Sequence, residues 1–158
     1  MTIKVKTEKV LGAYNVLNTA KYTKMDDADK IKVWKIARAL KPIATKFDDD
    51  SKDAAEKLKP EGFDDNLQKA QECERLVKNG NANYRDTAKL PMGAAEYGEF
   101  IKELQKYNRL VSEAVKEFAE KEVELTFDAL SEDAFGKLMA SNEWTMEQTV
   151  EIGMLIVE

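Results

Sequence analysis

The sequence predicts a mainly α protein: an antiparallel hairpin or bundle of two long helices, a small two-stranded β element and short C-terminal helices. Three observations predict this class. Apolar residues recur at helical 3/4 spacing over two long segments, and two short segments alternate polar and apolar residues. The 158-residue length suits one domain. We therefore expect a single helical domain over residues 1–158, with a long-helix arm at about 26–59 and 94–121 and a small head from 1–21 and 122–158.

The chain begins with a predicted strand over Thr2–Lys6, because Ile3 and Val5 alternate with polar residues. A helix is expected next, from about Thr7 to Lys21. The second strand is predicted where Val123, Leu125 and Phe127 alternate with polar residues. We expect it to pair with residues 2–6, since Lys4 and Lys6 opposite Glu122 and Glu124 form favourable cross-strand pairs.

The second helix has the clearest apolar stripe, and Asp26 or Asp27 can cap it. Its inward positions share the 3/4 spacing: Val33, Ile36, Ala37, Leu40, Ile43, Ala44 and Phe47. Pro42 lies in the middle and removes one backbone hydrogen bond, so the helix is expected to kink or restart there. The acidic run Asp48–Asp50 is expected to cap the restart or to form a solvated turn.

A third helix is predicted after Pro60-Glu61-Gly62, from Asp64 or Asp65 to about Lys78. Gly80 is a candidate left-handed cap. Residues 79–93 resemble a loop, because Asn, Gly, Asp and Pro cluster there. Long loops often carry function, and Tyr84 and Arg85 are candidate interaction residues in this one.

The fourth helix is predicted from about Ala94 to Lys121. Its apolar residues alternate steps of four and three, which indicates a heptad seam that includes Asn108. A polar seam residue either fixes the register of a partner or lies at a wet edge, and both readings stay open. Residues 1–46 hold 11 basic and 4 acidic side chains, whereas residues 47–158 hold 14 and 26. We expect the basic second helix to lie beside the acidic fourth.

Two short helices are expected at the C-terminal end. Ser131 caps the first, which ends near Ala140. Thr145 and Gln148 form a capping box for the second. Its apolar face is predicted to carry Val150, Met154 and Val157.

The composition excludes most familiar catalysis. The chain has no histidine and one cysteine, which rules out a Ser-His-Asp triad, a Cys-His dyad, a His-containing metal site and an internal disulfide. The acidic run from Asp48 fails the EF-hand pattern, because its sixth residue is Asp53 rather than glycine. We expect no catalytic residue, no metal and no cofactor.

No targeting or membrane segment is expected. The chain lacks a run of 18 apolar residues, and the first six residues lack the apolar region of a secretory signal. We therefore expect folding in a cytoplasm.

Trp34 lies off the main stripe of the second helix, beside Lys35 and Arg38. An exposed tryptophan among cations can anchor a protein interface or stack on nucleic acid. Alternatively, a third helix covers it within the fold, which is the reading that we favour. The candidate interaction residues are therefore Trp34, Lys35, Arg38, Tyr84, Arg85 and Asn108.

The layout resembles a family of small proteins of unknown function encoded by tailed bacteriophages and prophages. The resemblance is carried by the basic opening strand, the Lys-rich segment from Lys30 to Arg38, a Glu/Leu-rich helix leading into Glu122–Leu125, and a Thr-capped helix ending in Leu155–Glu158. It implies a viral setting, often among late structural genes, and a non-enzymatic role. It assigns no functional residues.

From this resemblance we expect a phage-encoded interaction protein that acts in virion or tail assembly, located in the bacterial host cytoplasm or the virion. The expected partner is a phage structural or host protein, with a homo-oligomer as a further form. One alternative is a phage inhibitor of a host protein such as a defence nuclease, motivated by the acidic surface. A second alternative is an accessory protein that binds nucleic acid through Lys30–Lys46. Nucleic acid is a less favoured partner than protein.

Overall fold

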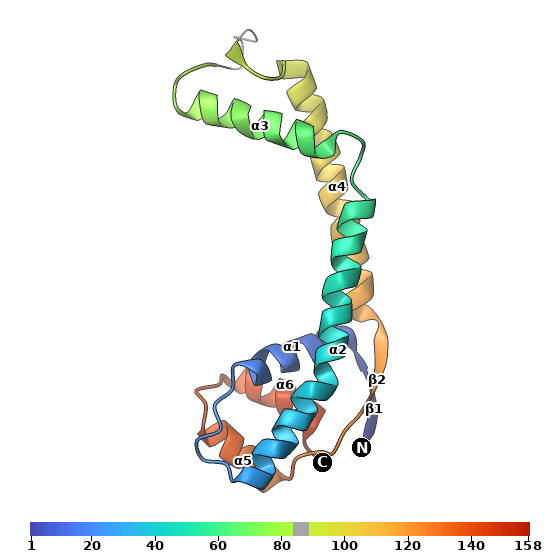
Figure 1. The fold of residues 1–158 in the computed structure, drawn as a ribbon, viewed down its shortest axis with the longest axis vertical. Helices are drawn as coiled ribbons and strands as arrows, with labels where there is room; N and C mark the ends of the chain where they lie inside the picture. The colour runs from blue at the N-terminus through green and yellow to red at the C-terminus, as the bar shows by residue number, and fades with distance from the viewer. Residues whose placement is uncertain (84–88) are drawn as a thin grey trace. The chain divides into compact units, whose positions relative to one another are not determined.

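The computed structural model describes residues 1–83 and 89–158. The fold is mainly α: two long helices form an antiparallel hairpin, accompanied by a two-stranded sheet and short C-terminal helices (Figure 1). The predicted fold class is confirmed. The elements in chain order are β1 (Thr2–Lys6), α1 (Thr7–Asn18), α2 (Asp27–Lys57), α3 (Phe63–Lys78), α4 (Ala94–Glu120), β2 (Glu122–Thr126), α5 (Glu132–Ala140) and α6 (Met146–Ile156).

The chain divides into two compact units. Unit 1 comprises Met1–Ser51 and Lys116–Glu158, and unit 2 comprises Lys52–Val115. Helices α2 and α4 have residues in both units. The single domain with a head at 1–21 and 122–158 stays a prediction; the unit that holds those two segments also takes in residues 22–51 and 116–121.

The sheet of unit 1 has the predicted register. Strands β1 and β2 pair antiparallel, with Lys4 opposite Glu124 and Lys6 opposite Glu122. This pairing joins segments that lie more than a hundred residues apart in the sequence. Just beyond the strands, the Thr7 hydroxyl donates to the Lys121 carbonyl at 2.8 Å and extends the connection. A single apolar core lies behind it, built from α1, α2, β2, α5 and α6.

Helix α2 is one uninterrupted helix through Pro42, so the predicted restart is wrong. Only the carbonyl four residues earlier, that of Arg38, loses its helical partner. Both residues are solvent-exposed, and water can satisfy that carbonyl. Asp48–Asp50 therefore lie inside α2 and form neither a cap nor a turn. The N-terminal cap is Asp26, whose carboxylate accepts the backbone N–H of Asp29 at 3.0 Å.

Unit 2 has its own small core, in which Phe63, Ala70, Cys73, Met92 and Phe100 are buried. Gly80 has φ +72° and closes α3 as predicted. The N–H of Asn81 donates to the Leu76 carbonyl, and that of Gly80 donates to the Val77 carbonyl, which is a Schellman motif.

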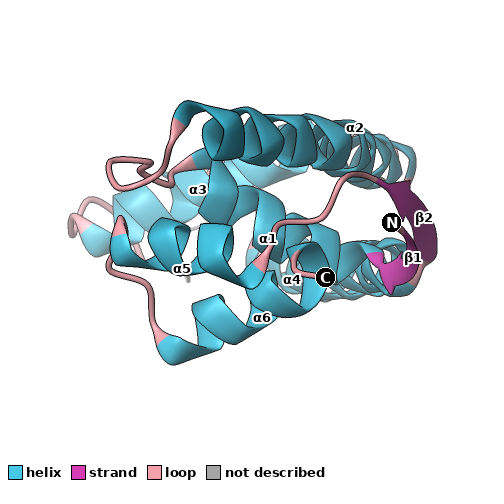
Figure 2. Ribbon diagram, turned by 90° about the horizontal axis from the view of Figure 1, so that it is seen from below, coloured by secondary structure: helices cyan, strands magenta, loops and turns pink. Residues whose placement is uncertain are grey.

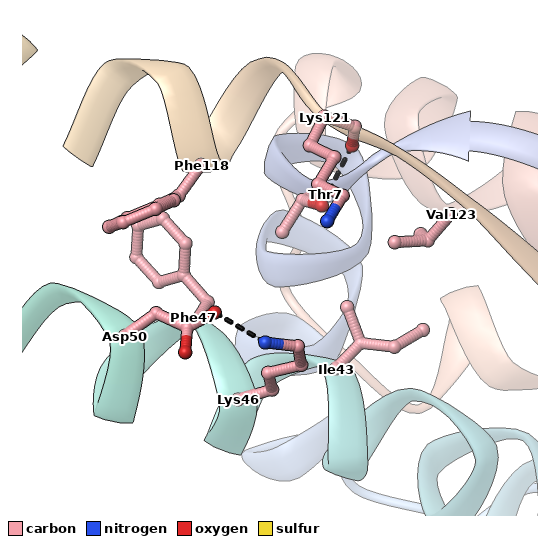
Figure 3. A pocket seen from close by; sticks show the side chains of 8 residues that line it. All are labelled: Thr7, Ile43, Lys46, Phe47, Asp50, Phe118, Lys121 and Val123. Atoms are coloured by element: carbon pink, nitrogen blue, oxygen red, sulfur yellow. Dashed lines mark hydrogen bonds and ion pairs between the residues drawn. The ribbon is translucent and has the colours of Figure 1, made fainter. Parts of the chain in front are cut away.

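Contacts within each unit establish the antiparallel course of α2 and α4. In unit 2, the Tyr107 hydroxyl donates to the Ala55 carbonyl at 2.8 Å. In unit 1, Phe47 and Phe118 line one pocket (Figure 3). No ion pair between described residues joins a cation of α2 to an acid of α4. Direct pairing between the two helices therefore does not account for the charge asymmetry; Lys46, for example, pairs with Asp50 of its own helix at 2.6 Å.

The inward face of α4 follows the predicted seam except at Asn108: the other seam positions are half-buried, and Phe100 and Tyr107 are added to them. Phe100 is buried and Tyr107 half-buried, whereas Asn108 is exposed. The helical period rotates Asn108 outward once the larger Phe100 and Tyr107 turn inward, since ring burial removes more apolar surface from water. Of the two readings left open for Asn108, its exposure favours the wet edge over a register-fixing contact.

Helix α6 buries the face opposite to the predicted one. Ile152, Leu155 and Ile156 are buried, whereas Val150 and Met154 are exposed. The predicted caps are confirmed: the Ser131 hydroxyl accepts the Ala134 N–H in α5, and Thr145 and Gln148 form the capping box of α6.

Candidate interaction site

The periodicity of α2 turns Trp34 toward solvent. The buried residues of this helix are Val33, Ile36, Leu40 and Ala44, all on one face. Trp34 follows Val33 by one residue, which is a rotation of about 100° away from that face. Its side chain is 57% exposed, and Ile31, three residues earlier on the same outward face, is 55% exposed. The reading of Trp34 as a covered residue is therefore wrong.

Trp34 and Ile31 form one wall of a surface groove. Lys30 and Tyr22 line the rest of the groove, which has a volume of about 310 Å³. The Tyr22 hydroxyl donates to the Leu17 carbonyl at 3.3 Å, which holds the ring in place. Burial raises the pKa of Tyr22, so its hydroxyl stays neutral at physiological pH. The groove is thus an aromatic and aliphatic surface with a cation at its edge.

Arg38 extends this surface along the helix. Its guanidinium lies over the Trp34 ring, 5.3 Å from the ring centroid. Such a cation–π contact orients both side chains at a small gain in free energy. Lys35 is exposed on the same face. The structure therefore brings together the three predicted residues of α2, Trp34, Lys35 and Arg38. We call the set Ile31, Trp34, Lys35, Arg38 and Lys41 the α2 face.

The charge of the α2 face is not neutralised within the described part of the chain. Asp27 pairs with Lys30 at 3.2 Å, and Lys137 of α5 lies within 4 Å of both Asp26 and Asp29. The acids at the start of α2 are therefore already matched. The three cations of the α2 face, Lys35, Arg38 and Lys41, form no ion pair with any described residue, and neither does the neighbouring Lys32. The surface as a whole presents exposed apolar side chains inside a field of positive charge.

The pKa shifts next to this surface come from ordinary pairing. The pKa of Asp26 is lowered, chiefly because its carboxylate accepts the Asp29 backbone N–H, with a contribution from Lys137. The pKa of Lys137 is raised, chiefly by its hydrogen bond with Asp133. Both shifts keep the groups charged at neutral pH. Neither prepares a group to gain or release a proton in that range.

The other predicted interaction residues do not join this surface. Tyr84 and Arg85 lie outside the described residues. Asn108 belongs to unit 2 and is exposed on α4. Sequence reasoning missed Ile31 and Tyr22. The three-residue spacing from Ile31 to Trp34 could have revealed the first, but Tyr22 comes from the connection between α1 and α2, where no periodicity applies.

A second pocket lies where α1, α2 and the end of α4 meet in unit 1 (Figure 3). Its volume is about 130 Å³, and Ile43, Phe47 and Phe118 supply apolar walls. Small-molecule sites in proteins usually measure about 300–1,000 Å³. This pocket is smaller, and its polar lining residues already interact with one another: Lys46 pairs with Asp50, and the Thr7 hydroxyl donates to the Lys121 carbonyl.

Neither a metal-binding cluster nor a membrane-spanning helix is present among the described residues. No group of three or more cysteine or acidic side chains is placed to hold a metal ion. No helix is both long and apolar enough to span a membrane.

No protein-family model, curated protein or solved structure matches this chain. The fold and the site define a class of protein by themselves: a helical protein whose surface exposes a tryptophan next to basic side chains.

Proposed function

We propose that this chain is a non-enzymatic, phage-encoded interaction protein that contributes to virion or tail assembly and docks a protein partner on the α2 face. The observation that carries the proposal is the exposure of Trp34 and Ile31 beside cations that no described acid neutralises. Tryptophan and arginine are the residues that most often dominate binding energy at protein interfaces. The viral setting comes from the family resemblance alone.

The chemistry of the α2 face defines the partner. Apolar side chains at positions 31 and 34 favour a partner with its own apolar anchors, and the unpaired cations favour acids around those anchors. The complementary surface is therefore an acidic amphipathic segment, such as a helix. We propose that this chain acts in the bacterial host cytoplasm or in the virion.

Mass spectrometry of purified particles and assembly intermediates tests the assembly role. We expect the wild-type chain in at least one of them. The Trp34→Ala variant should be depleted, because loss of an interface tryptophan weakens binding by about 2 kcal/mol or more, roughly 30-fold. Thr45→Ala, an exposed position of the same helix, is the matched control and should be retained.

Two results would refute this function. One is absence of the wild-type chain from both particles and intermediates. The other is equal incorporation of the wild-type and Trp34→Ala chains, which would mean that the α2 face does not make the contact.

A second candidate function is inhibition of a host protein such as a defence nuclease. A row of acids on α4 favours it: Glu96, Glu99 and Glu103 line one groove of unit 2. Carboxylates in a row can imitate the phosphates that a nuclease binds. Charge reversal at Glu99 should then abolish capture of the host protein, while Trp34→Ala should leave it intact. Recovery of capsid or tail proteins alone would rule this candidate out.

A further inference from the structure

A second exposed apolar surface lies on α6. Met146, Val150 and Met154 are 77%, 49% and 83% exposed. They are four residues apart, so they form one stripe along the helix. We call these three residues the α6 stripe. The helix itself is firmly placed, because its opposite face is buried in the core of unit 1 and its start carries a full capping box.

Solvation alone does not explain the α6 stripe. Scattered apolar residues are normal on a protein surface, but an aligned row marks a contact site. Methionine is suited to such a site, because its flexible thioether adapts to the shape of a partner and makes favourable contacts with aromatic rings. The α6 stripe therefore fits a partner surface that presents aromatic side chains.

The C-terminal segment that carries the α6 stripe is acidic. Residues 138–158 contain four acids and no basic residue: Glu143, Glu147, Glu151 and Glu158. Glu151 pairs with Lys9 of α1 at 3.3 Å, whereas Glu147, next to Met146 in the chain, has no ion-pair partner among the described residues. A partner of the α6 stripe must therefore supply positive charge around its apolar groups.

The α2 face has both properties required of such a partner, an aromatic side chain and surrounding positive charge. It presents Trp34 and Ile31 beside the groove, and residues 30–46 contain six basic residues and no acid. The two surfaces match in both respects: methionines against an aromatic ring, and carboxylates against cations. Pairing of two α6 stripes would place acids against acids, and pairing of two α2 faces would place cations against cations, which costs free energy in each case.

The α6 stripe and the α2 face of one molecule cannot contact each other. Helices α2 and α6 lie on opposite sides of unit 1, with α1 and α5 between them (Figure 2). Both helices bury their inner faces in the same core, so their outer faces point away from each other. Contact between the two surfaces therefore requires two molecules.

We propose that the α6 stripe of one copy docks on the α2 face of a second copy. This inference rests on the proposed function and names the partner as the chain itself. The contact is heterologous: each molecule binds one neighbour through its α6 stripe and another through its α2 face. Such a contact adds molecules in sequence and yields a ring or an open chain rather than a closed two-fold dimer.

Sedimentation velocity over a range of concentrations tests this pairing. The wild-type chain should form species larger than a dimer, and added salt should weaken them, because it screens the charge match. Trp34→Ala and Met154→Lys should each be monomeric when alone. Each variant changes an exposed side chain, and circular dichroism should show an unchanged helical fold.

An equimolar mixture of the two variants gives the sharpest result. The Trp34→Ala copy retains its α6 stripe and the Met154→Lys copy retains its α2 face, so the mixture should form a one-to-one dimer and stop there. Thr45→Ala and Asn15→Lys are the controls, since they change exposed positions of α2 and α1 and should associate like the wild type.

A monomeric wild-type chain at every concentration would overturn the inference. So would a Trp34→Ala chain that associates normally while Met154→Lys does not, since this outcome means that two α6 stripes pair. Either failure is distinct from failure of the proposed function, which is decided by whether the chain is incorporated into particles through Trp34.

Discussion

Replacing Phe63 with alanine should lower the free energy of unfolding of unit 2 by about 3–5 kcal/mol. The Phe63 side chain is 4% exposed, and its ring centroid lies 5.7 Å from that of Phe100 and 4.5 Å from that of Tyr107. The variant loses the burial of one ring and removes the aromatic neighbour of two others. The small core of unit 2 offers few apolar side chains to refill the space.

Hydrogen exchange is the appropriate measurement, because it reports each unit separately. Protection of the amides of α3 should fall in Phe63→Ala, while that of α1 and α6 should stay unchanged. Gln68→Ala changes an exposed position of the same helix and should leave exchange unaltered. Equal loss of protection in both units would contradict the assignment of Phe63 to a separate core.

Replacing Ile152 with alanine should lower the free energy of unfolding by about 2–5 kcal/mol. The side chain is fully buried in the core of unit 1, together with Leu138, Leu155 and Ile156. Its truncation removes apolar contacts and leaves a cavity. Urea unfolding followed by circular dichroism measures the effect.

Met154→Ala is the matched variant for the same helix. Its side chain is 83% exposed, so the change should stay within about 0.5 kcal/mol. A large loss from Met154→Ala and a small one from Ile152→Ala would mean that α6 is turned the other way. That result would also remove the α6 stripe from the surface.

Much of the fold could be predicted because its signals are local. Alternation along Thr2–Lys6 and Glu122–Thr126 defines the strands, and opposite charges at Lys4 and Glu124 select the register. The capping residues Ser131 and Thr145 identify the starts of α5 and α6. Each of these features depends on residues within a few positions of one another, or on a single favourable pairing.

The buried face of α6 could not be predicted, because both faces of the helix are apolar. Val150 and Met154 satisfy the helical spacing as well as Ile152 and Ile156 do, and only the shape of the surrounding core selects between them. Tertiary packing overrides local periodicity in such cases. A helix with two apolar faces is itself informative, since the face left outside is free to bind.

The candidate site could be predicted in part. The position of Trp34 off the apolar stripe follows from the 3.6-residue period. Whether another element covers it depends on contacts between distant segments, which periodicity does not report. The groove beside it also needs Tyr22, which comes from outside any regular element.

The environment of Trp34 in a complex tests most directly the claim that the α2 face is a docking surface. The chain has two tryptophans, so labelling with 5-fluorotryptophan gives two fluorine resonances, which Trp144→Phe assigns. For the dilute chain, we expect the Trp34 resonance to shift between H₂O and D₂O, as a solvent-exposed ring does. In complex with the protein that occupies the α2 face, whether a second copy at high concentration or a partner recovered from particles or assembly intermediates, that solvent shift should disappear. A Trp34 resonance that keeps its full solvent shift in the complex would contradict the claim.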